Sequence, residues 1–389
     1  MEFLMLRKSL ILIVICIFSL NGCGKKYSLK RDMINQSSEW AFYRGDIDAT
    51  GADDNAEFGG KLDVIWEYKS NDKPVGPLTI YNKTLIYPGA RNRIKFLSTK
   101  TGEYEGYIKP RGVAQTGLVI SDSLSYFATA PKKSKLRCIN LLNRKTVWKK
   151  DVKDAVGGSI IIEEKLILSS AEGRLYAFDK ITGEILWQFK SKQRFTTPPL
   201  FDGKSVWQVS EEGGLFAVDP KNGEQILYVA LDNPVVTSLA FDKSIYTCDI
   251  TGIVYKIDIS DGHIIWQTKT GAVSWGAVAV SGSSLIVGQS GGEVISLSVD
   301  DGRINWRFDA VNVVTASVLK VGKYVVFGSK TGDFYLLDAS DGALIEKRKL
   351  LGAVSFAPVS NGQYIFVVTD KGMITCFGVR NERQTKAND

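Results

Sequence analysis

Side chains that could carry out chemistry are scarce in this chain, which has one histidine and five cysteines among 389 residues. A structural zinc site needs about four closely spaced Cys or His ligands, and a nucleophilic triad needs a His near a Ser or Cys. The cysteines are too widely spaced for a metal site or a disulfide framework, and they lie at positions 16, 23, 138, 248 and 376. We therefore predict no metal site and no catalytic residues, and we expect His263, which follows a turn glycine, to be solvated.

Cys23 is the cysteine with a chemical signature of its own. Arg7 and Lys8 precede an uncharged apolar run over residues 9–20, which is the layout of a secretory signal and is short for a transmembrane helix. Residues 20–23, Leu-Asn-Gly-Cys, are similar to the lipobox of bacterial lipoproteins, in which the cysteine receives a diacylglycerol group. The alternative is an ordinary signal peptide with an incidental cysteine.

The lipobox divides the chain into four predicted parts. Residues 1–22 form a lipoprotein signal peptide, and residues 23–38 form the lipidated Cys23 with a polar, lysine-rich tether. Residues 39–379 form the folded domain, and the charged residues 380–389 form a disordered tail. Fatty acyl chains such as palmitate on Cys23 would hold the domain at a membrane surface. Gly24, where lipoproteins retained in the inner membrane have Asp, favours the outer membrane.

An internal repeat of about 40 residues indicates the fold. The clearest copy spans residues 173–187 and contains a glycine, an Asp, a second glycine and a Trp, in the pattern strand, tight turn, strand. Further copies start at residues 213, 252, 292 and 332, and two degenerate copies start near residues 94 and 136. The second-glycine position falls at residues 102, 144 (an Arg), 183, 223, 262, 302 and 342.

Each residue type in the repeat has a physical role. The second glycine allows the positive φ of a tight hairpin, and the Asp accepts hydrogen bonds from the turn amides. The Trp four residues later lies on the last strand, where its ring can fill the gap between neighbouring sheets. Two further apolar strands precede each copy, which gives four strands per repeat, the content of a propeller blade.

The two ends of the repeat array complete each other. The eighth copy starts at Gly372 and stops before its last strand, while residues 62–69 look like an isolated last strand before the first full repeat. Pairing them would close the ring and remove open sheet edges. We therefore predict an all-β fold, an eight-bladed β-propeller of four-stranded antiparallel blades, in which an N-terminal strand completes the last blade. An open array or two stacked domains is the alternative.

The repeat resembles that of the PQQ-like β-propellers, as residues 177–187 show most clearly, and the resemblance covers roughly residues 40–377. That family includes quinone-dependent dehydrogenases, which hold PQQ and Ca²⁺ in the central channel. A lipid-anchored eight-bladed propeller of this length is more similar to the propeller lipoproteins that help to insert β-barrels into the outer membrane. The resemblance thus implies a periplasm-facing, protein-binding scaffold whose partners belong to the β-barrel assembly machinery.

The channel can be examined by aligning the innermost strands. The alignment places eight uncharged residues around it: Pro77, Gln115, Gly158, Thr197, Ser238, Trp275, Ala316 and Phe356. A hard cation such as Ca²⁺ prefers several oxygen ligands, carboxylates above all, and this ring offers none. We therefore predict a non-enzymatic protein without a cofactor. A quinone-dependent dehydrogenase or a ligand-sensing propeller is the alternative, because Trp275 and Phe356 could stack on a planar ligand.

The surface offers weaker indications. The formal net charge is +7, but the basic residues are scattered and form no stripe that would indicate nucleic-acid binding. Our candidate for a partner-binding surface is the inter-blade loop over residues 192–199. It places Arg194 and Phe195 on a proline-stiffened connection, and Arg and aromatic residues are enriched in binding hot spots.

Overall fold

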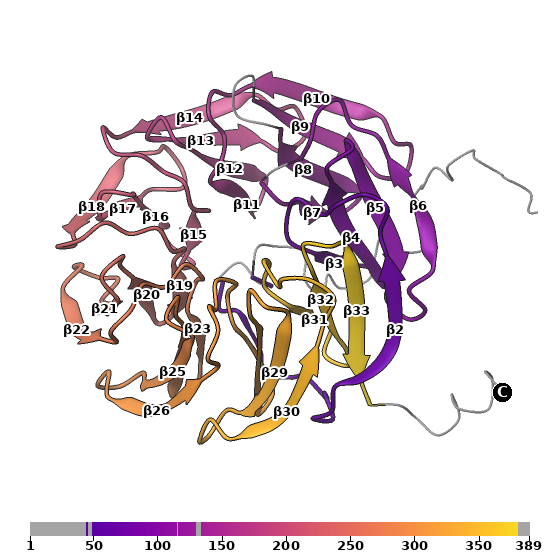
Figure 1. The fold of residues 1–389 in the computed structure, drawn as a ribbon. Helices are drawn as coiled ribbons and strands as arrows, with labels where there is room; N and C mark the ends of the chain where they lie inside the picture. The colour runs from indigo at the N-terminus through magenta and orange to yellow at the C-terminus, as the bar shows by residue number, and fades with distance from the viewer. Residues whose placement is uncertain (1–43, 46–48, 115, 130–133, 380–389) are drawn as a thin grey trace, which may run out of the picture.

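The computed structural model describes residues 44–45, 49–114, 116–129 and 134–379. These residues form eight β-sheets arranged around a central axis, as Figure 1 shows, and contain no helix. Accordingly, no apolar helix that could span a membrane occurs within these ranges. The prediction of an all-β, eight-bladed propeller is confirmed. Cys23 with its tether, Gln115 and the tail over residues 380–389 lie outside the described residues.

The strands follow one another blade by blade, from the innermost to the outermost. Blade 1 contains β3 (Thr79–Tyr81), β4 (Thr84–Gly89), β5 (Arg93–Ser98) and β6 (Tyr104–Ile108); blade 2 contains β7 (Val119–Ser121), β8 (Leu124–Ala128), β9 (Lys135–Asn140) and β10 (Thr146–Asp151). Blade 3 contains β11 (Gly158–Ile162), β12 (Lys165–Ser170), β13 (Arg174–Asp179) and β14 (Ile185–Lys190); blade 4 contains β15 (Leu200–Phe201), β16 (Val206–Val209), β17 (Gly214–Val218) and β18 (Gln225–Ala230).

The remaining blades keep this order. Blade 5 contains β19 (Ala240–Asp242), β20 (Ser244–Cys248), β21 (Ile253–Ile257) and β22 (Ile264–Lys269); blade 6 contains β23 (Ala279–Ser281), β24 (Ser284–Gly288), β25 (Glu293–Ser298) and β26 (Ile304–Asp309). Blade 7 contains β27 (Leu319–Val321), β28 (Tyr324–Gly328), β29 (Asp333–Asp338) and β30 (Leu344–Lys349). Blade 8 contains β31 (Val359–Ser360), β32 (Ile365–Val368), β33 (Met373–Gly378) and β2 (Asp63–Lys69).

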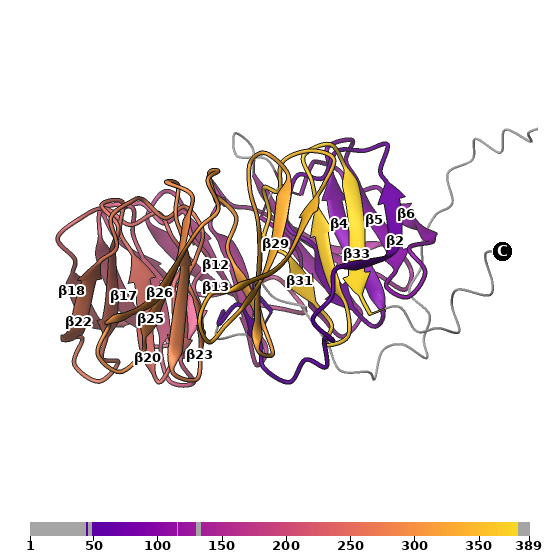
Figure 2. The ribbon, with the colours of Figure 1, turned by 60° about the horizontal axis from the view of Figure 1, so that its bottom comes forward.

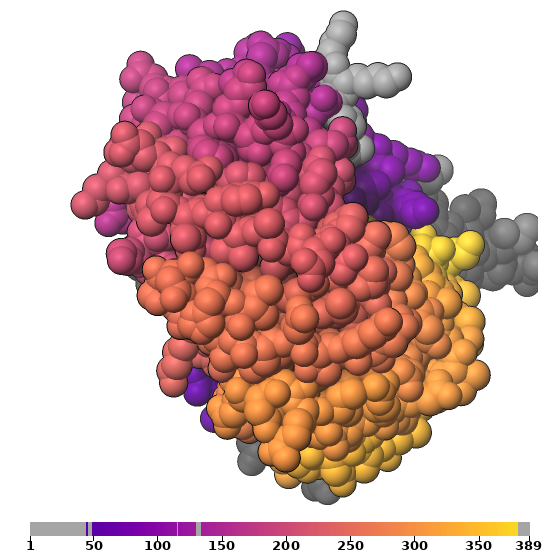
Figure 3. All heavy atoms as spheres, turned by 90° about the vertical axis from the view of Figure 1, so that its left-hand side faces the viewer, coloured from indigo at the N-terminus to yellow at the C-terminus, as the bar shows by residue number. Residues whose placement is uncertain are grey.

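The burial of each strand follows from its place in the blade. Third strands such as β13 are buried on both faces, because blades pack against them from both sides. Fourth strands such as β14 alternate between exposed and buried positions, since they form the rim. The side view in Figure 2 shows the resulting disc, and Figure 3 shows the rim, where blades 4–6 lie as closely packed bands. The core is therefore divided among the interfaces between neighbouring blades.

The repeat tryptophans join five of the eight blades to the next blade. Five indole Nε1 atoms donate hydrogen bonds of 2.9–3.0 Å to a carbonyl oxygen of the following blade, from Trp66, Trp148, Trp187, Trp266 and Trp306. Each of these rings also lies directly beneath the second glycine of the next repeat. A Cβ on Gly183, for example, would come within 2.5 Å of the Trp148 ring. This glycine is therefore required for two reasons, its φ of +70° and the close approach of the indole.

The ends of the described chain meet in blade 8. β2 pairs antiparallel with β33, so that Trp66 lies opposite Cys376 (Figure 1). A short strand that the sequence did not predict, β1 (Ala52–Asp53), pairs parallel with β27 and makes that sheet five-stranded. The segment that precedes β2 therefore runs against the innermost strands before it reaches the rim.

The three cysteines of the strands are buried side chains. Cys138, Cys248 and Cys376 are each fully buried and form no disulfide. Burial raises the pKa of the Cys138 and Cys248 thiols to about 12 and also raises that of Cys376. Such thiols are neutral and unreactive at ordinary pH.

Candidate functional site

The candidate sites lie on the face of the disc that carries the inter-blade loops, which we call the loop face. Each of these loops connects the outermost strand of one blade with the innermost strand of the next. A repeated hydrogen bond defines equivalent positions: the amide of the first loop residue donates to the carbonyl of the glycine that precedes the third strand. It is made by Ser191, Leu231, Thr270, Ala310 and Leu350. Loop residues at the same distance from this bond are structurally equivalent.

Phe195 does not lie on the surface, contrary to the sequence-based expectation. Its side chain is fully buried, with its ring 5.5 Å from that of Phe216 and 6.3 Å from that of Phe189. The position is the fourth after the repeated hydrogen bond, where Val235 and Val314 are also fully buried. An alignment of the loops would have revealed this, because the position is apolar or small throughout. Phe195 therefore anchors its loop in the core and does not itself offer a surface for a partner.

Arg194, by contrast, is an exposed residue of the loop face. Its Nε atom donates a 2.8 Å hydrogen bond to Glu211 Oε2, and its amide donates to Glu212 Oε2 at 2.9 Å. The two carboxylates come from the loop between β16 and β17, so the guanidinium is oriented by the protein before any partner arrives. The Arg194 side chain is 58% exposed, which leaves much of it free for contact.

The central channel holds a charged residue that the alignment of innermost strands could not supply. Arg44 is 4% exposed, and its guanidinium donates to Ala277 O at 3.0 Å and Val278 O at 2.7 Å, at the start of the innermost strand of blade 6. It lines a narrow cavity together with Pro77 and Gly158. The expectation of an uncharged channel is therefore corrected: the ring positions are uncharged, but the segment before β1 brings an arginine to them.

The other predicted channel residues lie at different heights. Ser238 is equivalent to Pro77 and Gly158, whereas Thr197 and Phe356 lie one residue nearer to the loop face, and both Thr197 and Ser238 are buried. Trp275 lies two residues nearer, where its side chain is 55% exposed. The described residues that line the cavity include no carboxylate, so they do not fit a Ca²⁺-bound quinone.

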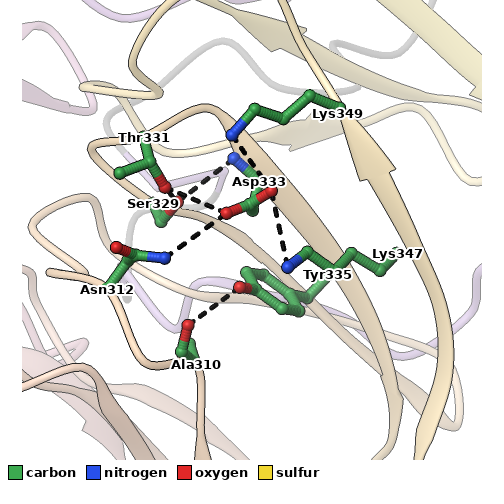
Figure 4. A network of polar contacts seen from close by, with 8 residues as sticks. All are labelled: Ala310, Asn312, Ser329, Thr331, Asp333, Tyr335, Lys347 and Lys349. Atoms are coloured by element: carbon green, nitrogen blue, oxygen red, sulfur yellow. Dashed lines mark hydrogen bonds and ion pairs between the residues drawn. The ribbon is translucent and has the colours of Figure 1, made fainter.

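Buried aspartates organise the loop face. In blade 7, Asp333 accepts a hydrogen bond from Thr331 Oγ1 at 2.9 Å and ion-pairs with Lys349 Nζ at 3.3 Å and Lys347 Nζ at 3.5 Å, as Figure 4 shows. Asn312, from the preceding loop, donates to the same carboxylate at 3.4 Å. Burial alone would raise the pKa of Asp333, but the Thr331 and lysine contacts hold it below its ordinary value.

The equivalent region of blade 5 contains a denser network around Asp249, which is fully buried. Its carboxylate accepts hydrogen bonds from the amides of Thr251 and Ile253 at 2.8 and 2.9 Å, from Tyr255 Oη at 2.7 Å and from Asn233 Nδ2 at 2.9 Å. Burial opposes ionisation, but these donors keep the pKa of Asp249 below its ordinary value. Asn233 belongs to the preceding loop, so the network fixes that loop on its blade.

On the opposite face, His263 lies in an exposed turn with two carboxylates. Its Nδ1 atom is 2.7 Å from Asp261 Oδ1, and this hydrogen bond raises the pKa of His263 above its ordinary value. Asp258, Asp261 and His263 lie close enough together to hold a metal ion, but Asp258 and Asp261 already accept hydrogen bonds from turn amides. The arrangement is that of a self-contained turn.

The closed ring, the tryptophan joints and the repeat define an eight-bladed PQQ-like β-propeller. Comparison with protein families identifies the group more closely. The model of the family described as outer membrane protein assembly factor BamB matches residues 132–234 and 227–389, about two thirds of the chain, and the protein belongs to this family.

Individual relatives are more distant. BamB of Moranella endobia (strain PCIT) is 27% identical over 145 residues, 37% of this chain and 37% of its own length. Tetrathionate hydrolase of Acidithiobacillus ferrooxidans is 27% identical over 112 residues, 28% of this chain and 22% of its own length. The chain thus aligns with only 22% and 37% of the length of these two relatives.

Solved structures show the same fold. BamB from Moraxella catarrhalis superposes with a TM-score of 0.72 at 15% identity, covering 82% of this chain and all of that one. A europium-containing methanol dehydrogenase superposes with a TM-score of 0.75 at 12% identity, covering 90% of this chain and 99% of that one. At these identities the likeness concerns the fold, which scaffolds and dehydrogenases share.

Proposed function

We propose that the protein is a non-enzymatic scaffold of the bacterial envelope, anchored by lipid at Cys23 on the periplasmic side of the outer membrane. It binds proteins of the β-barrel assembly machinery. The observation that carries this proposal is the match to the BamB family over about two thirds of the chain. The channel supports the same reading, because Arg44 occupies it and the described lining residues offer no carboxylate for a quinone–Ca²⁺ pair.

Arg194 is the residue that we propose to contact a partner. It is exposed and held by Glu211, so little conformational entropy is lost when it binds. Phe195 supports the loop from below, and its role is to keep Arg194 in place. The remaining channel residues, Thr197, Ser238, Trp275 and Phe356, are proposed as structural lining, with Trp275 as the one exposed ring among them.

Affinity capture from detergent-solubilised envelopes tests this function. The full-length protein should recover subunits of the β-barrel assembly machinery, and Arg194→Glu should lower the recovery about tenfold, because it replaces an attraction by a repulsion at the contact. Arg303→Glu is the matched control, since Arg303 is also exposed and paired with a carboxylate, that of Asp301, but lies in a turn on the opposite face. Recovery without any assembly subunit would contradict the proposal.

Two further experiments test the lipid anchor and the alternative function as a quinone-dependent dehydrogenase. Cys23→Ser should move the protein from the membrane fraction to the soluble periplasm, because it removes the acceptor of the lipid. Dye reduction by the purified protein in the presence of PQQ and Ca²⁺ would favour a quinone-dependent dehydrogenase, and we expect none.

A further inference from the structure

Two blades contain a buried cation at a position where blades 3–7 have an aromatic or aliphatic side chain and blade 8 has Thr375. The position lies on the third strand of each blade. It directly precedes the residue that pairs with the repeat tryptophan, as Tyr176 precedes Ala177, the partner of Trp187. In blades 3–7 it is occupied by Tyr176, Phe216, Tyr255, Ile295 and Tyr335. In blades 1 and 2 it is occupied by Lys95 and Arg137, which are 2% and 6% exposed. A buried cation needs a compensating acceptor or anion.

Lys95 obtains its compensation within the protein. Its Nζ atom donates to Asn71 Oδ1 at 2.8 Å and to Ser70 Oγ at 3.2 Å, and both acceptors belong to the loop that leads into blade 1. Burial lowers the pKa of Lys95, while the nearby Asp72 acts in the opposite direction. Ser70 and Asn71 therefore supply hydrogen-bond acceptors for the buried ammonium group of Lys95, and Asp72 supplies a nearby negative charge.

Arg137 does not have the same surroundings. The isolated bridges Pro74–Gly89 and Ala114–Thr129 make residues 110–112 equivalent to residues 70–72, and their sequence is Pro-Arg-Gly. The loop that supplies acceptors in blade 1 thus supplies another cation, Arg111, in blade 2. Burial and the charge of Arg111 both lower the pKa of Arg137, whose Nε atom has no hydrogen-bond partner. Within the described ranges, no carboxylate forms an ion pair with either arginine.

The same blade interface contains a groove. Blade 1 has Gly106 at the position of the repeat tryptophan, and blade 2 has Arg144 at the position of the second glycine, with a φ of +63°. Without an indole between them, the blades leave a pocket lined by Tyr107, Ile108, Lys109, Asn143 and Arg144.

We propose that an acidic segment of a protein partner binds at the interface between blades 1 and 2, along Lys109 in the groove and Arg111 two residues further on, with a partner carboxylate accepting hydrogen bonds from Arg111 and Arg137. Two parallel N–H donors of a guanidinium match the two oxygens of a carboxylate. Arg111 is exposed and Arg137 is only 6% exposed, so a single side-chain carboxylate on a polypeptide suits this pair better than the plane of a lipid bilayer, which contacts exposed residues alone. The inference rests on this interface alone and does not depend on the proposed role in barrel assembly.

Fluorescence anisotropy with a short labelled oligoglutamate peptide tests the proposal on the purified protein. We expect saturable binding that weakens with added salt, and a loss of about tenfold or more in affinity for Arg111→Asp. The new carboxylate would pair with Arg137 inside the protein, so the same variant should also unfold at a higher temperature than the wild type. This combination of weaker binding and greater stability would not arise from general damage to the fold.

The controls decide between the possible outcomes. Lys221→Asp makes the same charge change at an exposed turn of blade 4 and should leave the affinity unchanged. Arg137→Tyr restores the residue of blades 3, 5 and 7, and should fold while losing peptide binding. The proposal is overturned if oligoglutamate does not bind saturably, or if both Asp variants weaken binding equally. It is also overturned if phosphatidylglycerol vesicles bind through Arg111 and the peptide does not.

Discussion

Replacing Asp249 by alanine should destabilise the protein far more than the same change at Asp258, a half-buried aspartate in a solvent-exposed turn of the same blade. The fully buried Asp249 carboxylate accepts hydrogen bonds from the amides of Thr251 and Ile253, from two side-chain hydroxyls and from Asn233. Alanine would leave these donors without a partner, among them the hydroxyl of the fully buried Tyr255. Hydrogen bonds to a charged group contribute roughly 1.5–3 kcal/mol each, and they are not additive within one network. We expect a loss of about 3–5 kcal/mol in the free energy of unfolding.

Asp258→Ala is the matched control, because Asp258 lies in the exposed turn of the same blade and accepts its hydrogen bonds from Ser260 in contact with water. Its loss should cost less than about 1 kcal/mol. Denaturant unfolding followed by tryptophan fluorescence measures both variants. Equal effects of the two substitutions, or a loss below about 1 kcal/mol for Asp249→Ala, would refute the view that this network fixes the loop face.

The pH dependence provides a second check on the same residue. The pKa of Asp249 is lowered in the folded protein, so its contribution to stability is present above the unfolded-state pKa of about 3.9. That contribution is lost as the pH falls through the lower, folded-state value. The difference in stability between the wild type and Asp249→Ala should therefore be constant near neutral pH and shrink below about pH 4. A difference that grows with acidification would contradict the assignment.

Three further predictions follow from the fold. Gly183→Ala should lower the free energy of unfolding by about 2–4 kcal/mol, because the added Cβ is strained at positive φ and also collides with the Trp148 ring. Gly203→Ala, with φ +90° and no atom within 4 Å of the added Cβ, should lower it by only about 1 kcal/mol. Thermal or denaturant unfolding measures both. The imidazole of His263 should titrate above its ordinary pKa in an NMR experiment and return to it in Asp261→Asn, and the stabilisation from this pair should be present at low pH and lost as the pH rises through the folded-state pKa. The strand cysteines should not react with a thiol reagent until the protein is unfolded, because burial keeps these thiols neutral; rapid labelling of the native protein would contradict their placement.

The repeat made most of the fold predictable from the sequence. The glycine and the aspartate at fixed spacing form a turn, and the tryptophan contacts the next blade. Because these contacts are local, the spacing of the three residues predicts them without the structure. The closure of the ring was predictable for the same reason, since the strand over residues 62–69 and the incomplete copy after Gly372 each lack the part that the other supplies. Even the exceptions are local. At the interface between blades 1 and 2, Gly106 takes the place of the large tryptophan and Arg144 takes the place of the small glycine.

What the sequence did not show depends on contacts without a repeat. β1 pairs with a strand more than 260 residues away, and Arg44 reaches the channel through hydrogen bonds to backbone carbonyls, which have no residue signature. Phe195 looked like a surface aromatic because its loop was considered alone and not beside the equivalent loops. The pair of Arg111 and Arg137 is visible only when the blades are superposed and their differences are compared.

The pairing of β2 with β33 has a consequence for the order of folding. Each of the other blades can assemble from a contiguous stretch of chain, whereas this blade joins residues more than 300 positions apart. Contacts of such long range are slow to form, because the entropy of the intervening chain must be lost first. We expect the first seven blades to form early and the two ends to dock last, so that an incomplete ring with exposed strand edges is the intermediate most prone to aggregation.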